Sequence, residues 1–156
     1  MRLIDSDILS YALYDESPAH PYAWSILERG LLGEIEVYVT YTTILEAYNV
    51  LYWFYRVRPL RALIEKIKLT VSGLKVVETS TMGLSISLAE NIPLGDGFLI
   101  AAALEHHIPI IVSNDSHIAS KAPKHGLIVE NPIPEHIRRE MGKWRHEASQ
   151  PGETLQ

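Results

Sequence analysis

The chain has 156 residues, of which 47% are hydrophobic and 21% are charged, and this composition is typical of one globular domain with a sizeable core. It contains no cysteine, which excludes disulfides, thiolate metal sites and cysteine nucleophiles. No apolar run is long enough to span a bilayer, and the net charge of −5 excludes a surface that is basic throughout. We therefore expect a cytoplasmic protein that does not associate with membranes.

The N-terminal part of the chain alternates strands with helices. A short strand at residues 2–5 leads into a helix at residues 8–14. Ser17 and Pro18 are typical of a helix N-terminus, and the glycines at positions 30 and 33 end the helix that follows. After a strand at residues 37–40, a helix is expected over residues 42–57. This last helix is apolar almost all round, which predicts burial against two neighbours.

The middle of the chain continues the same alternation. A helix that starts at Pro59 ends near Gly73, and a strand follows at residues 74–77. Another helix is expected at residues 80–91. The Ala/Leu/Ile run that follows predicts a further helix with Asp96 in its first turn, and the β-branched run at residues 108–112 predicts a buried strand.

The C-terminal part completes a single α/β domain. A fifth strand is expected at residues 127–129, and Pro132 and Pro134 end the core. Ile137, Met141 and Trp144 are expected on the apolar stripe of a last amphipathic helix, and the polar tail from His146 is expected to be disordered. Strands that alternate with helices predict a three-layer α/β/α sandwich with a central parallel sheet.

Four acidic residues from separate segments are expected at one edge of this sheet. Asp5 ends the first strand, and Asp115 follows the fourth. Glu46 and Asp96 lie early in helices that run antiparallel to the strands, so their N-terminal turns lie at the same carboxyl edge. Open parallel α/β sheets bind their ligands at this edge.

Such a group of acids needs either raised pKa values or a bound cation. Two carboxylates about 4 to 5 Å apart repel each other by roughly 3 to 4 kcal/mol at an effective dielectric constant near 20. Oxygen ligands without cysteine or a paired histidine motif favour Mg²⁺ or Mn²⁺ over zinc. A hard divalent ion in an acidic pocket is the usual means of attacking phosphate esters.

Each acid also has a purely structural alternative. Asp96 fits a favourable first-turn acid, Asp115 fits an Asx turn, and Asp7 fits the cap of the helix that starts at Ile8. Thr43 and Glu46 fit a capping box. Asp5 is the acid that these alternatives explain least well, because it directly continues an apolar strand.

Basic and histidine residues add two further expectations. Arg56, Arg58 and Arg61 begin a run of basic residues that either binds single-stranded or structured RNA or forms a solvated helix face. The histidines show no ligand spacing, and His117 is the one expected near the acidic edge.

Four segments in order and spacing resemble the PIN domain, especially the VapC-type ribonuclease toxins of prokaryotic toxin–antitoxin pairs. These segments are Leu3–Leu9, Ile44–Ala47, Leu94–Ala103 and Ile111–Asp115, and the likeness extends over about residues 2–129. It predicts a PIN-like nuclease domain at residues 1–132, followed by a C-terminal helix and disordered tail at residues 133–156. We expect that helix to serve dimerisation or antitoxin contact.

The resemblance implies roles for individual residues. The acidic quartet of the family would fall on Asp5, Glu46, Asp96 and Asp115, with Asp5 and Asp96 as the principal Mg²⁺ ligands. Ser113 or Asn114 would be a polar helper beside those ligands, and so would Asp7. The family also implies cleavage of single-stranded RNA, homodimers and inhibition by a cognate antitoxin.

The chain departs from the family pattern at three places near these acids. Asp7 stands where Asn or Ser is common, Ser113 stands where Thr is frequent, and His117-Ile118 replaces a more usual Asp-Phe pair. The four acids remain in place. The changes fall on the groups around them, which set the pH optimum and the metal preference.

Other functions fit parts of the same pattern. A housekeeping RNA-processing nuclease would carry the same site, and a non-catalytic PIN module would keep the fold without turnover. A haloacid-dehalogenase-like phosphatase also has Asp-x-Asp after its first strand, as at Asp5 and Asp7, although Leu9 is the wrong residue for that chemistry. Such a phosphatase would hydrolyse a nitrophenyl phosphate, whereas a PIN nuclease would not.

Overall fold

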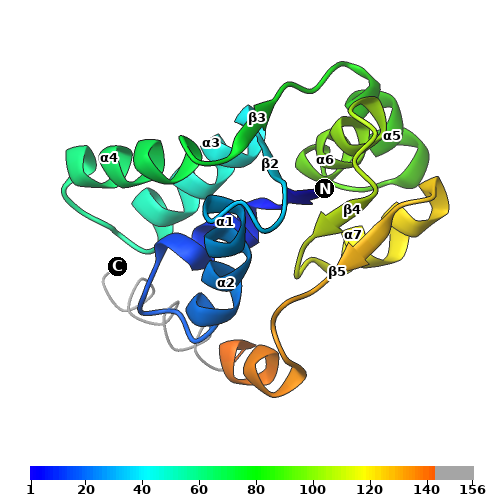
Figure 1. Cartoon of the computed structure of the whole chain (residues 1–156). Helices are drawn as coiled ribbons and strands as arrows, with labels where there is room; N and C mark the ends of the chain where they lie inside the picture. The colour runs from blue at the N-terminus through cyan, green and yellow to red at the C-terminus, as the bar shows by residue number, and fades with distance from the viewer. Residues whose placement is uncertain (143–156) are drawn as a thin grey trace, which may run out of the picture.

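A five-stranded parallel sheet forms the centre of the computed structural model, which describes residues 1–142 (Figure 1). The sheet order is β3-β2-β1-β4-β5. The strands are β1 (Arg2–Ile4), β2 (Val37–Thr40), β3 (Lys75–Val77), β4 (Ile110–Val112) and β5 (Ile128–Glu130). The helices are α1 (Ser6–Leu13), α2 (His20–Leu31), α3 (Tyr41–Asn49), α4 (Leu60–Val71), α5 (Met82–Glu90), α6 (Leu94–Glu105) and α7 (Ser116–Lys121).

Helices cover both faces of the sheet, as the sequence predicts. Neighbouring strand residues point to opposite faces, so Leu3 lies in one buried hydrophobic cluster and Ile4 in the other. The cluster around Ile4 contains side chains of α1, α2, α3 and α4, and the cluster around Leu3 contains side chains of α5, α6 and α7. Figure 1 shows these two groups of helices on opposite sides of the strands. The fold is therefore the expected α/β/α sandwich.

The direction of the chain through the sheet reverses between β1 and β4. From β1 the chain moves outward to β2 and β3, then returns to add β4 and β5 on the other side of β1. In the register of the central pair, Ile4 lies opposite Val112. Asp5 and Ser113, one residue beyond each strand, are therefore neighbours at the carboxyl edge, where this topology leaves a crevice for a ligand.

The prediction of one long apolar helix over residues 42–57 is wrong for the second half of that range. The structure ends α3 at Asn49 and continues with a π-helical turn, η1 (Val50–Phe54), and Arg56 has a positive φ of 59°. The ring of Tyr55 stacks on Tyr14 with their centroids 4.5 Å apart, which holds this wider turn against the C-terminal end of α1. A helix that is apolar all round carries no periodic signal for such a break.

The beginning of α2 also differs from the prediction. Residues 18–19 form a turn and α2 begins at His20, so Ser17 does not cap a helix there. Its hydroxyl instead accepts a hydrogen bond from the Ala19 N–H at 3.2 Å. Proline at the second helical position is still compatible with the new start, because the first turn needs no N–H donor there.

After β4 the chain forms two short helical elements that the sequence did not predict, α7 and the 3₁₀-helical turn η2 (Ala122–His125). A further helix covers residues 135–142, and Ile133 and Met141 are buried in the Ile4 cluster. Trp144 and the tail from His146 lie outside the described residues. Within residues 1–142, no helix combines the length and apolar character that a membrane crossing needs.

Candidate active site

Asp5 lies where β1 ends and α1 begins. It is buried, with 6% of its surface exposed, and it is the N-cap of α1. One carboxylate oxygen accepts the N–H of Ser6 at 2.7 Å, and the other accepts the hydroxyl of Ser113 at 2.6 Å. The expectation that Asp7 caps this helix is therefore wrong, because the helix starts two residues earlier than its apolar pattern indicated.

Asp7 instead joins the first turn of α1 to the loop after β4. Its Oδ1 accepts the N–H of Ile8 at 2.7 Å, and its Oδ2 accepts the N–H of Asn114 at 3.0 Å. Burial, followed by the nearby charge of Asp5, raises the pKa of Asp7 well above its ordinary value. The contact fixes the position of the loop that carries Ser113 and Asp115.

Hydrogen bonds inside that loop set the direction of Asp115. The Ser113 hydroxyl oxygen accepts the N–H of Asp115 at 3.0 Å, and Asn114 Oδ1 accepts the side-chain amide of Asn131 at 2.8 Å. Asp115 is the N-cap of α7, since its Oδ1 accepts the N–H of His117 at 2.7 Å. The local role considered for Asp115, an Asx turn, is thus realised as a helix N-cap. This cap uses only one of the two carboxylate oxygens, Oδ1.

Glu46 and Asp96 approach the same edge from α3 and α6. The N-cap of α3 is Thr40, whose hydroxyl accepts the N–H of Thr43 at 3.0 Å, so the alternative of a capping box formed by Thr43 and Glu46 is not realised. Glu46 lies further along the helix, and its carboxylate fills the space that a side chain at Gly95 would take. Asp96 lies in the first turn of α6, as predicted.

The carboxylate of Asp96 is the least satisfied acid of the group. Asp96 as a whole is 9% exposed, and its Oδ2 atom is buried without a hydrogen-bond partner among the described residues. Burial, followed by the charges of Asp115, Asp5 and Glu46, raises the pKa of Asp96 to about 7. A buried oxygen without a partner is costly and calls for a ligand.

The other acids are perturbed by the same neighbours. Burial, and then the charge of Asp5, raises the pKa of Glu46 to about 7. Burial also raises the pKa of Asp5 against the hydrogen bonds from Ser113 and Ser6, which lower it. The structure therefore brings Asp5, Glu46, Asp96 and Asp115 into one electrostatically coupled group at the carboxyl edge.

His117 adds an imidazole to this group. Its Nδ1 lies 3.5 Å from Oδ1 of Asp115 and 3.8 Å from Oδ2 of Asp96. One ligand atom from each of these three residues lies within 4.8 Å of the others, which is the spacing of a group that can hold a metal ion. The unpartnered oxygen, the excess of carboxylates and the donor chemistry all fit a divalent cation.

Two hollows adjoin the acids. A small cleft of about 110 Å³ lies between the start of α1 and η1, where Asp7 faces Val50 and Tyr55. A larger cavity of about 380 Å³ is lined by Asp115, Asn131 and Arg138 among others. The sequence did not point to Arg138 for this position, because an amphipathic helix pattern does not tell which face meets a distant loop.

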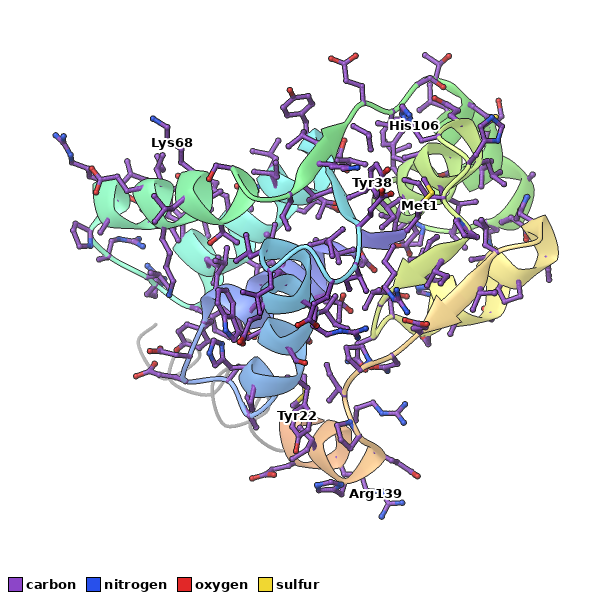
Figure 2. All side chains as sticks on the ribbon, in the orientation of Figure 1. Met1, Tyr22, Tyr38, Lys68, His106 and Arg139 are labelled. Carbon is purple, nitrogen blue, oxygen red and sulfur yellow. The ribbon has the colours of Figure 1, made fainter. Side chains whose placement is uncertain are left out.

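Two of the three arginines proposed for RNA binding lie in the segment between η1 and α4, and Arg61 lies in the first turn of α4. Arg58 donates to the carbonyl of Tyr52 at 2.7 Å and lies 3.6 Å above the centre of the Tyr52 ring, so it holds its own loop. Arg61 pairs with Glu65 at 3.1 Å on an exposed face of α4. Arg56 is exposed and directly follows Tyr55, which lines the small cleft. Figure 2 shows Lys68, further along α4, pointing away from the sheet.

The fold and site define an α/β protein with a cluster of acidic side chains at the point where the strand order of its parallel sheet reverses. The chain belongs to the PIN domain family, whose model matches residues 2–124. No curated protein matches it.

Two solved structures share the fold at low sequence identity. PAE2754 from Pyrobaculum aerophilum is 18% identical with a TM-score of 0.60, and the match covers 82% of each chain. VapBC2 from Rickettsia felis, solved bound to a DNA fragment from its promoter, is 15% identical with a TM-score of 0.60. That match covers 83% of this chain and 97% of the other.

Proposed function

We propose that this protein is a metal-dependent ribonuclease that hydrolyses phosphodiester bonds of single-stranded RNA, with Mg²⁺ or Mn²⁺ as its cofactor. Membership of the PIN domain family supports a nuclease. The observation that carries the proposal is the buried, unpartnered Oδ2 of Asp96 among three further carboxylates at the carboxyl edge of the sheet. Proteins leave such an oxygen unpaired mainly where a ligand completes it.

Asp5, Asp96, Asp115 and Glu46 would hold the ion. When bound, a divalent ion would offset the charge of the scissile phosphate and lower the pKa of a water molecule. Asp5 is the best fixed of these groups, because Ser6 and Ser113 both donate to it. Asp7 is a positioning residue that acts through the backbone N–H of Asn114. The Ser113 hydroxyl orients the Asp5 carboxylate, to which it donates, and the backbone of Asp115, from whose N–H it accepts.

The hollows beside the acids are suited to the flanking RNA. The 380 Å³ cavity has room for a nucleotide unit, and Arg138 on its wall provides a positive charge for a phosphate. On the other side, Tyr55, whose ring stacks on Tyr14, lines the small cleft beside Asp7. Arg56, next to Tyr55, is the better candidate of the three arginines for the RNA backbone, because Arg58 and Arg61 have partners already.

We further propose that the chain is the toxin of a VapBC-type toxin–antitoxin pair. The similarity to a structure titled VapBC2 supports this assignment, and so does the spacing of the four acidic segments. An antitoxin segment would then be a partner of the site region. A small gene directly upstream that encodes a DNA-binding segment followed by an amphipathic tail would support the toxin over a housekeeping RNA-processing nuclease.

A homodimer formed through α3 and α4 is also proposed. A groove of about 290 Å³ between these helices is lined by Tyr41, Ile44, Leu45, Tyr48, Ile64 and Ile67. Tyr41 and Leu45 are 62% and 60% exposed, and large exposed apolar patches mark protein contacts. A monomeric mass in multi-angle light scattering at micromolar concentration would refute the dimer, and Leu45→Lys should produce monomers from it.

The test of the nuclease is direct. Purified protein with Mn²⁺ should cleave labelled single-stranded RNA, EDTA should stop the cleavage, and Asp96→Asn should abolish it while the circular dichroism spectrum stays the same. Cleavage that survives Asp96→Asn would refute the site. A folded protein that never cleaves any RNA would point to the non-catalytic module instead.

A further inference from the structure

We propose that His117 is a metal ligand, so that the site is a mixed nitrogen and oxygen site that prefers Mn²⁺ and Co²⁺ to Mg²⁺. This inference rests on the proposed metal-dependent nuclease and specifies which ion its site selects. It concerns a residue outside the four acids, at a position where the sequence departs from the PIN pattern.

The position of His117 results from the structure of the loop. Asp115 caps α7 through the N–H of His117 itself, so the cap fixes the backbone that carries the imidazole. The ring nitrogen Nδ1 then lies 3.5 Å from Asp115 and 3.8 Å from Asp96. Neither separation is a hydrogen bond of ordinary length, so the three side chains surround a space without closing it.

The space between the three side chains is close to the size of an ion. Two ligand atoms on opposite sides of an ion at about 2.1 Å are about 4.2 Å apart. The atoms of Asp96, Asp115 and His117 lie within 4.8 Å of one another, so movements of a few tenths of an ångström would close the group. The His117 side chain is 56% exposed and can make that movement.

A second observation shows that this space lacks a group. Asp96 is nine-tenths buried, and its Oδ2, the oxygen nearest to His117, has no hydrogen-bond partner among the described residues. If His117 were only a counter-charge for the acids, it would be expected to close on that oxygen as a hydrogen-bonded pair. The gap of 3.8 Å instead leaves room for a shared ion.

The imidazole ligand determines the choice of ion. Carboxylate and water ligands suit Mg²⁺, whereas imidazole binds first-row transition ions better, in an order that rises from Mn²⁺ to Co²⁺ and beyond. Mg²⁺ also gives up its waters reluctantly. A site in which one imidazole joins the carboxylates therefore favours Mn²⁺ and Co²⁺ over Mg²⁺, compared with a site made only of acids.

The experiment measures metal binding without RNA. Isothermal titration calorimetry with Mn²⁺, Co²⁺ and Mg²⁺ is compared for the native protein, His117→Ala and His117→Asp. His107→Asp is the matched control, because His107 is exposed at the opposite end of α6 from Asp96, and Asp tolerates its positive φ. Electron spin-echo modulation of bound Mn²⁺ reports directly whether a ¹⁴N nucleus is a ligand.

We expect ¹⁴N modulation in the native protein and in His107→Asp, and none in His117→Ala. His117→Ala should weaken Mn²⁺ and Co²⁺ binding about tenfold or more and change Mg²⁺ binding by less than about threefold. His117→Asp should lower the ratio of Mn²⁺ to Mg²⁺ affinity.

Bound Mn²⁺ without nitrogen modulation, or unchanged selectivity in His117→Asp, would overturn the role of His117 while leaving the nuclease intact. Absence of any metal binding, together with absence of cleavage, would overturn both proposals.

Discussion

Replacing Asp96 with asparagine should stabilise the metal-free protein while it abolishes activity. Burial of the carboxylate, followed by the charges of Asp115, Asp5 and Glu46, raises its pKa from 3.8 to about 7. A carboxyl group whose pKa is raised in the fold opposes folding when it is ionised. Asparagine keeps nearly the same shape and removes the charge.

The sign and size of the effect follow from the pKa. Below about pH 4, Asp96 is protonated in both the folded and the unfolded chain and does not change the free energy of unfolding. Between about pH 4 and 7, Asp96 ionises only in the unfolded chain, so the folded protein loses stability as the pH rises. The loss is complete above about pH 7. At about 1.4 kcal/mol for each pKa unit, the limit is about 4 kcal/mol at pH 8. Relaxation of the site reduces this to about 2 kcal/mol, or about 4 to 8 °C in Tm.

Thermal unfolding of native protein and Asp96→Asn in EDTA, at pH 4.5 and pH 8, measures the effect. Asp96→Asn should be the more stable protein at pH 8, and the difference should be much smaller at pH 4.5. Saturating Mn²⁺ should raise the Tm of the native protein and change that of Asp96→Asn little, because only the native site binds the ion tightly. If Asp96→Asn is less stable than the native protein at pH 8, the four carboxylates do not oppose folding and the reasoning fails.

Three further substitutions test other parts of the structure. Gly95→Ala places a methyl group on the carboxylate of Glu46, which is flexible, so cleavage should fall about tenfold or more with a Tm change of less than about 2 °C; full activity would show that the position of Glu46 is unimportant. Arg138→Ala should raise KM for RNA, leave kcat nearly unchanged and lower the slope of binding against salt by about one, whereas Arg139→Ala, which is exposed and paired with Glu135, should do neither. Met141→Ala removes a side chain that is 2% exposed in the core and should cost about 2 to 4 kcal/mol in urea unfolding; a cost below about 0.5 kcal/mol would mean that the last helix does not pack on the domain.

The last helix also has a proposed role in assembly. Figure 2 shows Tyr22 of α2 near this helix, and Ile133 and Met141 are buried in the same cluster as α2. Deleting residues 133–156 would therefore expose part of the core. A change of oligomeric state after that deletion must be compared with Met141→Ala, which weakens the packing alone.

The sequence by itself determined the sheet and the edge at which the acids lie. Short β-branched strands that alternate with helices allow little but a parallel sheet. Because parallel strands run in the same direction, Asp5 and Asp115, which follow their strands, lie at the same edge. Asp96 follows from the same rule, because its helix must run back against the strands. These features depend on the order of strands and helices along the chain, which the sequence pattern alone predicts.

Tertiary structure alone decided which side chains face one another. Asp7 and Glu46 do not cap their helices as their local sequences suggest, because a polar residue near a helix start fits several positions that differ by two or three residues. The π-helical turn after Asn49 is followed by the stacking of Tyr55 on Tyr14, a contact between residues distant in sequence. The gap between Asp96 and His117 likewise arises from two separate helices, and no spacing along the chain encodes it, because through-space distances are set by packing.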